Sequence, residues 1–180
     1  MKGLIIYDSK YGATRQYAMW LSQRLLLPFR PSASITDEDL VNTDFFLLGS
    51  PVYIGRLTLK KWFTRKKAFL QNKQVLFFIV CGSAEDKEKQ TSIIKQNALE
   101  TIVSPGNIYF LPGRVNPQQL SFADKIKLRM GAMFEKDPLK KKGMLTGMDG
   151  VSMQQLAPVI SAANHYLALG RRTITRVSTI

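Results

Sequence analysis

The chain has 180 residues, 45% of them hydrophobic, which suffices for one globular domain with a buried core. One cysteine, Cys81, excludes an internal disulfide, and one cysteine with one histidine excludes a transition-metal cluster, so we predict no metal site. Twenty-six Lys and Arg against 13 Asp and Glu give a net charge of +13, which favours anionic partners.

Apolar runs alternate with helical patterns along most of the chain. The predicted elements are a strand at 2–8, a helix at 13–27, a loop bracketed by Pro28 and Pro31, a short edge strand at Ser34 and Ile35, a helical turn at 37–42, a strand at 45–49, a helix at 58–70, a strand at 75–80, a helix at 86–103, a strand at 107–111 and a final helix at 152–169. This alternation, with continuously apolar strands, predicts an α/β domain with a parallel sheet.

The region 113–150 does not fit the alternation and is too long for a plain loop, so we expect it to be functional. Its apolar residues recur at helical spacing, with a basic flank and a lysine run beside them: Phe122, Ile126, Met130, Met133 and Phe134; Lys125, Arg129 and Lys136; Lys140, Lys141 and Lys142. A basic amphipathic helix indicates either a membrane-surface or partner-binding element, or a helix packed on the domain with its lysines solvated.

A possible phosphate site follows the first strand. Two hydroxyls, a lysine and a glycine stand between this strand and the first helix, in Ser9-Lys10-Tyr11-Gly12-Ala13-Thr14. A helix N-terminus with added hydroxyl donors binds anions without a metal. An ordinary strand-to-helix turn uses the same residue types, so this stretch alone leaves both readings open.

Ligands of parallel sheets bind at the carboxyl ends of the strands, so the next two loops matter as well. The second strong strand is followed by Gly49-Ser50-Pro51-Val52-Tyr53-Ile54-Gly55-Arg56, where Tyr53 could stack on a flat ligand or form part of a half-buried turn. The third is followed by Cys81-Gly82-Ser83. Together, the three loops suggest a mononucleotide laid across the strand ends.

The order of these loops resembles the flavodoxin family, which binds FMN without a covalent bond. Ser9, Gly12 and Thr14 match the family's phosphate loop, whereas Tyr11 replaces the threonine common in carriers. The resemblance implies a single domain over 1–180: a three-layer flavodoxin-like fold with a five-stranded parallel sheet in the order 2-1-3-4-5 and an insert at about 115–150. It implies these FMN contacts: Ser9, Lys10, Tyr11, Gly12, Ala13 and Thr14; Ser50, Pro51, Val52, Tyr53, Ile54 and Gly55; Cys81, Gly82, Ser83, Gly113 and Arg114.

The chain also resembles the menaquinone-dependent protoporphyrinogen dehydrogenase branch of the family in two features. These are a basic net charge and an insert before the last helix, which opens with Pro112-Gly113-Arg114-Val115. That likeness implies an FMN-dependent oxidoreductase of heme biosynthesis, which oxidises protoporphyrinogen IX and reduces a quinone. The alternative is an electron-transfer protein that docks on a redox partner and has no substrate of its own. Catalytic side chains are not identified, because the flavin carries the chemistry.

Location and other partners follow from hydropathy and charge. The longest strongly apolar run, 75–81, is too short to span a bilayer, and the first residues do not form a signal peptide, so we expect a cytoplasmic protein. The basic insert adds an anionic membrane surface as a partner, which would make the protein peripheral on the inner face of the membrane. No nucleic acid is expected, since no recognition module is visible.

Overall fold

The computed structural model describes residues 1–135 and 137–177, with 170–177 described as helical backbone. Strands are β1 (Gly3–Tyr7), β2 (Phe29–Pro31), β3 (Phe45–Tyr53), β4 (Arg56–Leu57), β5 (Gln74–Cys81), β6 (Ile108–Pro112), β7 (Arg114–Val115) and β8 (Met148–Asp149). Helices are α1 (Ala13–Leu25), α2 (Asp37–Val41), α3 (Lys60–Arg65), α4 (Lys67–Leu70), α5 (Lys87–Asn97), α6 (Phe122–Phe134), α7 (Pro138–Thr146) and α8 (Ala157–Val177). Short 3-10 turns cover Ser32–Ser34, Leu99–Thr101, Pro105–Asn107 and Met153–Leu156.

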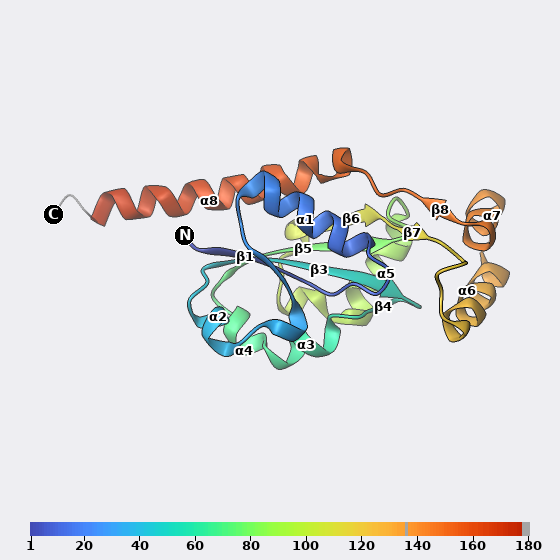
Figure 1. The fold of residues 1–180 in the computed structure, drawn as a ribbon. Coiled ribbons are helices and arrows are strands. Elements are labelled where there is room, and N and C mark those ends of the chain that lie inside the picture. The colour runs from blue at the N-terminus through green and yellow to red at the C-terminus, as the bar shows by residue number, and fades with distance from the viewer. Residues whose placement is uncertain (136, 178–180) are drawn as a thin grey trace.

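The sheet confirms the predicted fold class. Its parallel strands lie in the order β2-β1-β3-β5-β6, which is 2-1-3-4-5 when the core strands are counted along the chain. Helices α1 and α8 cover one face, and α2, α3 and α4 lie on the other (Figure 1). Short β4 pairs antiparallel with the end of β3, and β7 pairs with β8 in a separate ribbon.

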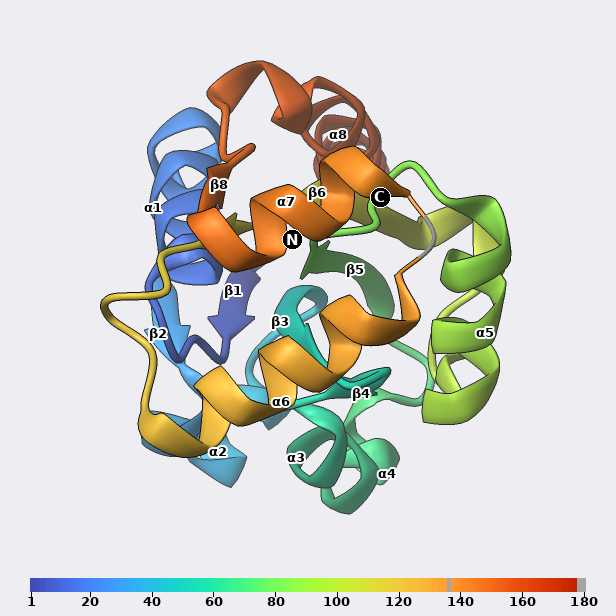
Figure 2. The same ribbon diagram turned by 90° about the vertical axis from the view of Figure 1, so that its right-hand side faces the viewer.

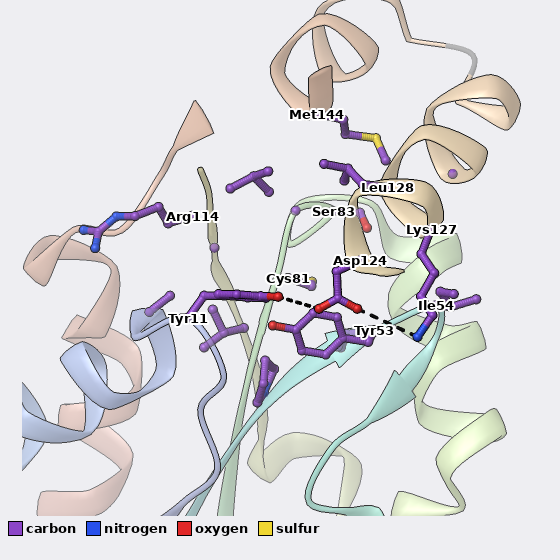
Figure 3. Close-up of a pocket in the computed structure, with 18 of the residues that line it drawn as sticks. Tyr11, Tyr53, Ile54, Cys81, Ser83, Arg114, Asp124, Lys127, Leu128 and Met144 are labelled. Atoms are coloured by element: carbon purple, nitrogen blue, oxygen red, sulfur yellow. Dashed lines mark hydrogen bonds and ion pairs between the residues drawn. The ribbon is translucent and has the colours of Figure 1, made fainter. Parts of the chain in front are cut away.

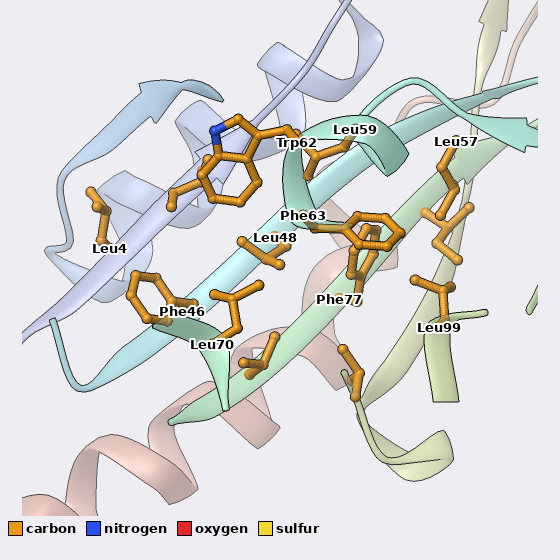
Figure 4. Packing of buried hydrophobic residues seen from close by; sticks show 14 of the residues in the cluster. Leu4, Phe46, Leu48, Leu57, Leu59, Trp62, Phe63, Leu70, Phe77 and Leu99 are labelled. Atoms are coloured by element: carbon orange, nitrogen blue, oxygen red, sulfur yellow. The ribbon is translucent and has the colours of Figure 1, made fainter. Parts of the chain in front are cut away.

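The central strands are apolar on both sides because both of their faces are covered. Along β5, Phe77 and Ile79 point to the α2–α5 side, while Leu76, Phe78 and Val80 point to the α1 and α8 side. Phe63 of α3 meets Phe77 edge-on, with ring centroids 5.9 Å apart (Figure 4). Each such buried ring stabilises the fold by about 1.5–3 kcal/mol relative to an exposed one.

Several predicted boundaries were wrong. The predicted strand 45–49 continues to Tyr53, and the final helix is Ala157–Val177 rather than 152–169. The edge strand is Phe29–Pro31, not Ser34 and Ile35. Proline is tolerated there because the outer side of an edge strand needs no backbone N–H donor. The predicted helix 58–70 divides at Lys66 into α3 and α4. The predicted helix 86–103 ends at Asn97, where Ala98 adopts a left-handed conformation.

The insert consists of β7, α6, α7 and β8. Figure 2 looks onto the carboxyl ends of the strands and shows α6 and α7 lying in front of them. Figure 1 shows the same pair at the opposite end of the molecule from the C-terminus of α8. No helix among the described residues combines the length and hydropathy needed to cross a bilayer. The α6–α7 pair, called the roof below, therefore covers the edge where the loops were predicted to bind a ligand.

Candidate functional site

A cavity of about 540 Å³ lies between the strand ends and the roof. The chain passes from β1 outward to β2 and then returns to β3 on the other side of β1, so the loops after β1 and β3 diverge and leave a crevice. The cavity volume falls within the range of about 300–1,000 Å³ that is usual for small-molecule sites.

The phosphate loop ends in a helix start that has room and donors for an anion. Gly12, the N-cap of α1, has φ +88°, a left-handed conformation that favours glycine, and it has no side chain to cap the helix. Ser9 Oγ accepts from Arg15 N of the first turn at 3.3 Å. Thr14 is buried, and its Oγ1 has no hydrogen-bond partner among the described residues. A buried hydroxyl without a partner is costly, so this one points to a missing acceptor. A phosphate group fits that requirement.

The segment 49–56, predicted as the loop after the strand, is the end of β3 followed by a tight hairpin turn into β4. Strand β3 continues to Tyr53, and Ile54 and Gly55 then turn the chain with φ values of +48° and +71°. A left-handed β-branched residue costs on the order of 1–3 kcal/mol. Buried Asn97 holds the turn: its Nδ2 donates to the Gly55 carbonyl at 2.8 Å, and its Oδ1 accepts from Leu57 N at 3.0 Å.

Two tyrosines and a lysine form one side of the cavity. The rings of Tyr11 and Tyr53 lie 6.3 Å apart between centroids, and Lys10 Nζ lies 5.5 and 5.7 Å from the two centroids. Burial, with nearby acidic groups, raises the pKa of Tyr53 far above its usual range, so its hydroxyl stays protonated. Burial likewise raises the pKa of the Cys81 thiol, which disfavours a nucleophilic role.

Two carboxylates of the insert join it to the core. At the start of α6, Asp124 Oδ2 accepts from Lys10 Nζ and from Tyr11 Oη, each at 2.5 Å. Figure 3 shows the contact with Tyr11. Just past the end of α6, Glu135 pairs with Lys89 of α5 at 2.8 Å. The helix thus bridges the cavity from the phosphate loop to α5.

Asp124 is the most perturbed acid of the site. Its side chain is only 7% exposed. The hydrogen bond from Lys10, followed by that from Tyr11, lowers its pKa to about 2, and the same contact raises the pKa of Lys10. Lys127 approaches the other carboxylate oxygen at 3.8 Å. Asp124 therefore remains a fixed negative charge over a wide pH range, surrounded by cations and a phenol.

The structure brings nearly all of the predicted site residues together. The cavity wall contains Ser9, Lys10, Tyr11, Ala13, Thr14, Pro51, Val52, Tyr53, Ile54, Gly55, Cys81, Gly82, Ser83, Gly113 and Arg114. Gly12 and Ser50 are not part of it. Ser50 is buried beneath the wall, where its Oγ accepts from Leu59 N and donates to the Pro51 carbonyl, so it supports the hairpin.

The insert contributes wall residues that were not among the predicted ligand contacts. They are Leu120, Asp124, Lys127, Leu128, Met130, Gly131, Phe134, Glu135, Lys140, Met144 and Met148. Helical spacing in the sequence had identified Met130, Phe134 and the lysine run, but it gave no sign that the insert contacts the loop after β1. Nothing in the local sequence indicates that Asp124 contacts Lys10, 114 positions away. The predicted flank residue Lys136 lies outside the described residues.

Comparisons with known proteins agree with this architecture. The flavodoxin-domain family model matches residues 4–141. No curated protein sequence matches the chain. Similar solved structures include the flavodoxin of Megasphaera elsdenii, with 21% identity over 60% of this chain and 84% of that chain and a TM-score of 0.48. The Trp repressor binding protein of Bacillus subtilis gives 17% identity, 80% and 96% coverage and a TM-score of 0.48.

The rubredoxin oxygen:oxidoreductase of Desulfovibrio gigas is similar to most of this chain, with 14% identity and a TM-score of 0.46 over 88% of it. This chain spans only 37% of that protein. The family assignment therefore rests on the family model, which matches residues 4–141.

Proposed function

Because the chain belongs to the flavodoxin domain family, we propose that it binds FMN in the cavity under the roof. The observation that carries the cofactor assignment is the buried Thr14 hydroxyl, which lacks a partner beside the start of α1. The FMN phosphate would meet this hydroxyl and the first amides of α1. The ring would lie along the hairpin and the Cys81–Ser83 loop, both of which line the cavity.

We further propose that the protein is an oxidoreductase with its own substrate. The roof supports this, since it encloses space beside the ring that simple exchange of electrons between proteins does not require. Its inner surface is apolar and adaptable, with Leu128, Met130 and Met144 in the wall. Five basic side chains line the same cavity against two acidic ones: Lys10, Lys89, Arg114, Lys127 and Lys140, with Asp124 and Glu135. These features fit a flat, apolar molecule that carries carboxylates.

Protoporphyrinogen IX has these properties: its macrocycle would pack on the methionines, and its propionates would face the cations. FMN held in this cavity would supply the redox chemistry between such a substrate and a quinone acceptor. The protein's residues position both partners and exclude water. A quinone acceptor dissolved in the bilayer would require the protein to bind the inner face of a membrane as a peripheral protein.

The decisive experiment measures oxidation of protoporphyrinogen IX by the FMN-loaded protein in detergent, with menadione as acceptor, by porphyrin fluorescence. Quinone-dependent porphyrin formation supports the proposal. If the flavin is reduced by a flavodoxin reductase but never by protoporphyrinogen, the protein is an electron carrier and the substrate assignment is wrong.

A matched pair of variants on α7 tests the role of the cavity cations. Lys140 lines the cavity, whereas Lys142 is exposed and does not. Lys140→Met should raise KM by about fivefold, the equivalent of an ion pair worth ~1 kcal/mol, and Lys142→Met should leave KM unchanged. Equal effects of the two changes would remove Lys140 from substrate binding.

A further inference from the structure

Helix α6 exposes an apolar face to solvent. Five of its side chains are between 46% and 82% exposed: Phe122, Ile126, Met130, Met133 and Phe134. At about 100° of rotation per residue, they lie within an arc of about 120° along a helix about 20 Å long. Leu139 and Leu145 of α7 are also exposed. Monomeric proteins rarely expose contiguous apolar patches of this kind without an interaction to serve.

Basic side chains flank this apolar face. Lys125 and Arg129 border the apolar arc on one side, and Lys127 borders it on the other. Acids of the insert are engaged elsewhere, with Asp124 and Glu135 paired to the core. Within the described part of the chain, Lys125, Arg129, Lys141 and Lys142 form no ion pair. The outer surface of the roof therefore combines exposed apolar side chains with unpaired cations.

The mouth of the cavity opens onto the same surface. Met130 and Phe134 belong both to the exposed arc and to the cavity wall. Ile54, at the tip of the β3–β4 hairpin, is 72% exposed and also lines the cavity. A molecule leaving the apolar surface would thus enter the cavity without crossing a polar barrier at these residues.

We propose that the outer surface of the roof docks on an anionic lipid bilayer, with α6 lying in the plane of the interface. The apolar arc would enter the boundary between headgroups and acyl chains, and the bordering cations would contact lipid phosphates. A second copy of the chain is a poorer occupant, because a two-fold contact would place the same unpaired cations of two protomers against each other. This inference does not depend on the protein's having an enzymatic substrate.

The test measures co-sedimentation of the FMN-loaded full chain with vesicles of phosphatidylcholine alone or mixed with phosphatidylglycerol. Binding should require the anionic lipid and fall steeply with salt, because the Debye length shrinks from ~10 Å at 0.1 M to ~3 Å at 1 M. The double variant Lys125→Glu/Arg129→Glu should bind at least about 30-fold more weakly, since each cation near the membrane contributes a factor of about five.

A matched control exists on α3, where Lys61 and Arg65 repeat the same residue types at the same spacing. Helix α3 lies beneath the sheet, set back from the roof (Figure 1). Lys61→Glu/Arg65→Glu changes the net charge equally and should retain most of the binding. Phe122→Ser/Met133→Ser should lose binding even at low salt; neither residue lines the cavity.

Three outcomes would overturn the proposal. One is equal sedimentation with neutral and anionic vesicles, and another is equal loss of binding in the α3 control. The third is a dimer in solution, dissociated by Phe122→Ser/Met133→Ser, in a protein that does not bind vesicles. None of these results bears on turnover in detergent, so the two proposals can fail separately.

Discussion

Asp124→Asn should release the roof while leaving the core folded. The substitution keeps the shape of the side chain but removes the charge that accepts from Lys10 and Tyr11 at 2.5 Å. The pKa of Asp124 falls from 3.8 to about 2 on folding. At ~1.36 kcal/mol per unit, this corresponds to about 2.4 kcal/mol of preferential interaction with the charged form. Because Lys10 is about half exposed, solvent screening reduces the expected loss to about 1–2 kcal/mol.

Limited proteolysis reports this loss directly. Trypsin cleaves after Lys125, Lys127 and Arg129, all on α6. When opening is faster than cleavage, the rate follows the open fraction, so a loss of about 1–2 kcal/mol should speed cleavage about 5- to 30-fold. The melting temperature of the core should change little, because the affected contacts hold the roof rather than the sheet.

Asp37→Asn is the matched control. Asp37 pairs with Lys66 at the same 2.5 Å, but its side chain is 60% exposed, against 7% for Asp124. Exposed pairs contribute about 0–1 kcal/mol, so this change should leave cleavage of α6 unchanged. Unaltered cleavage in Asp124→Asn, or an equal rise in the control, would refute the view that this carboxylate holds the roof.

Three further results are expected. Thr14→Val removes an unsatisfied buried hydroxyl, so it should stabilise the FMN-free protein by up to about 1–3 kcal/mol in thermal melts. The same change should weaken FMN binding at least about tenfold in fluorescence titration, and a less stable apoprotein would contradict the phosphate assignment. Asn97→Ala should lower the free energy of unfolding by about 2–4 kcal/mol in urea, because the Gly55 carbonyl and Leu57 N lose buried partners; a loss below about 1 kcal/mol would mean that water replaces the amide. Asp124→Asn should speed hydrogen exchange of the α6 amides relative to the wild type by the full amount above about pH 5, and this difference should disappear as the pH falls through 2, because protonation removes the contribution of the depressed-pKa carboxylate; an undiminished difference at pH 2 would exclude this origin.

Local sequence patterns are enough to predict the α/β class and most of the cavity wall. Local patterns suffice for this: β5 is apolar throughout because both faces of a central parallel strand are covered, and its length sets it apart from a helix. Loops at the carboxyl ends of parallel strands meet at one edge in any such sheet. The order of the three loops therefore predicts that residues such as Thr14, Tyr53 and Ser83 line one cavity, as they do.

Only the packing of the whole chain shows where the insert lies and what it contacts. Its helical spacing was visible in the sequence, but a helix shows which residues share a face and not which partner that face meets. Asp124 lies among lysines in the sequence and reads as one acid on a solvated helix, although it is buried against Lys10 and Tyr11. Tyr11, the departure from the family's usual phosphate loop, is explained by that contact. Such pairings join distant parts of the chain, because packing of whole elements and not local propensity brings them together.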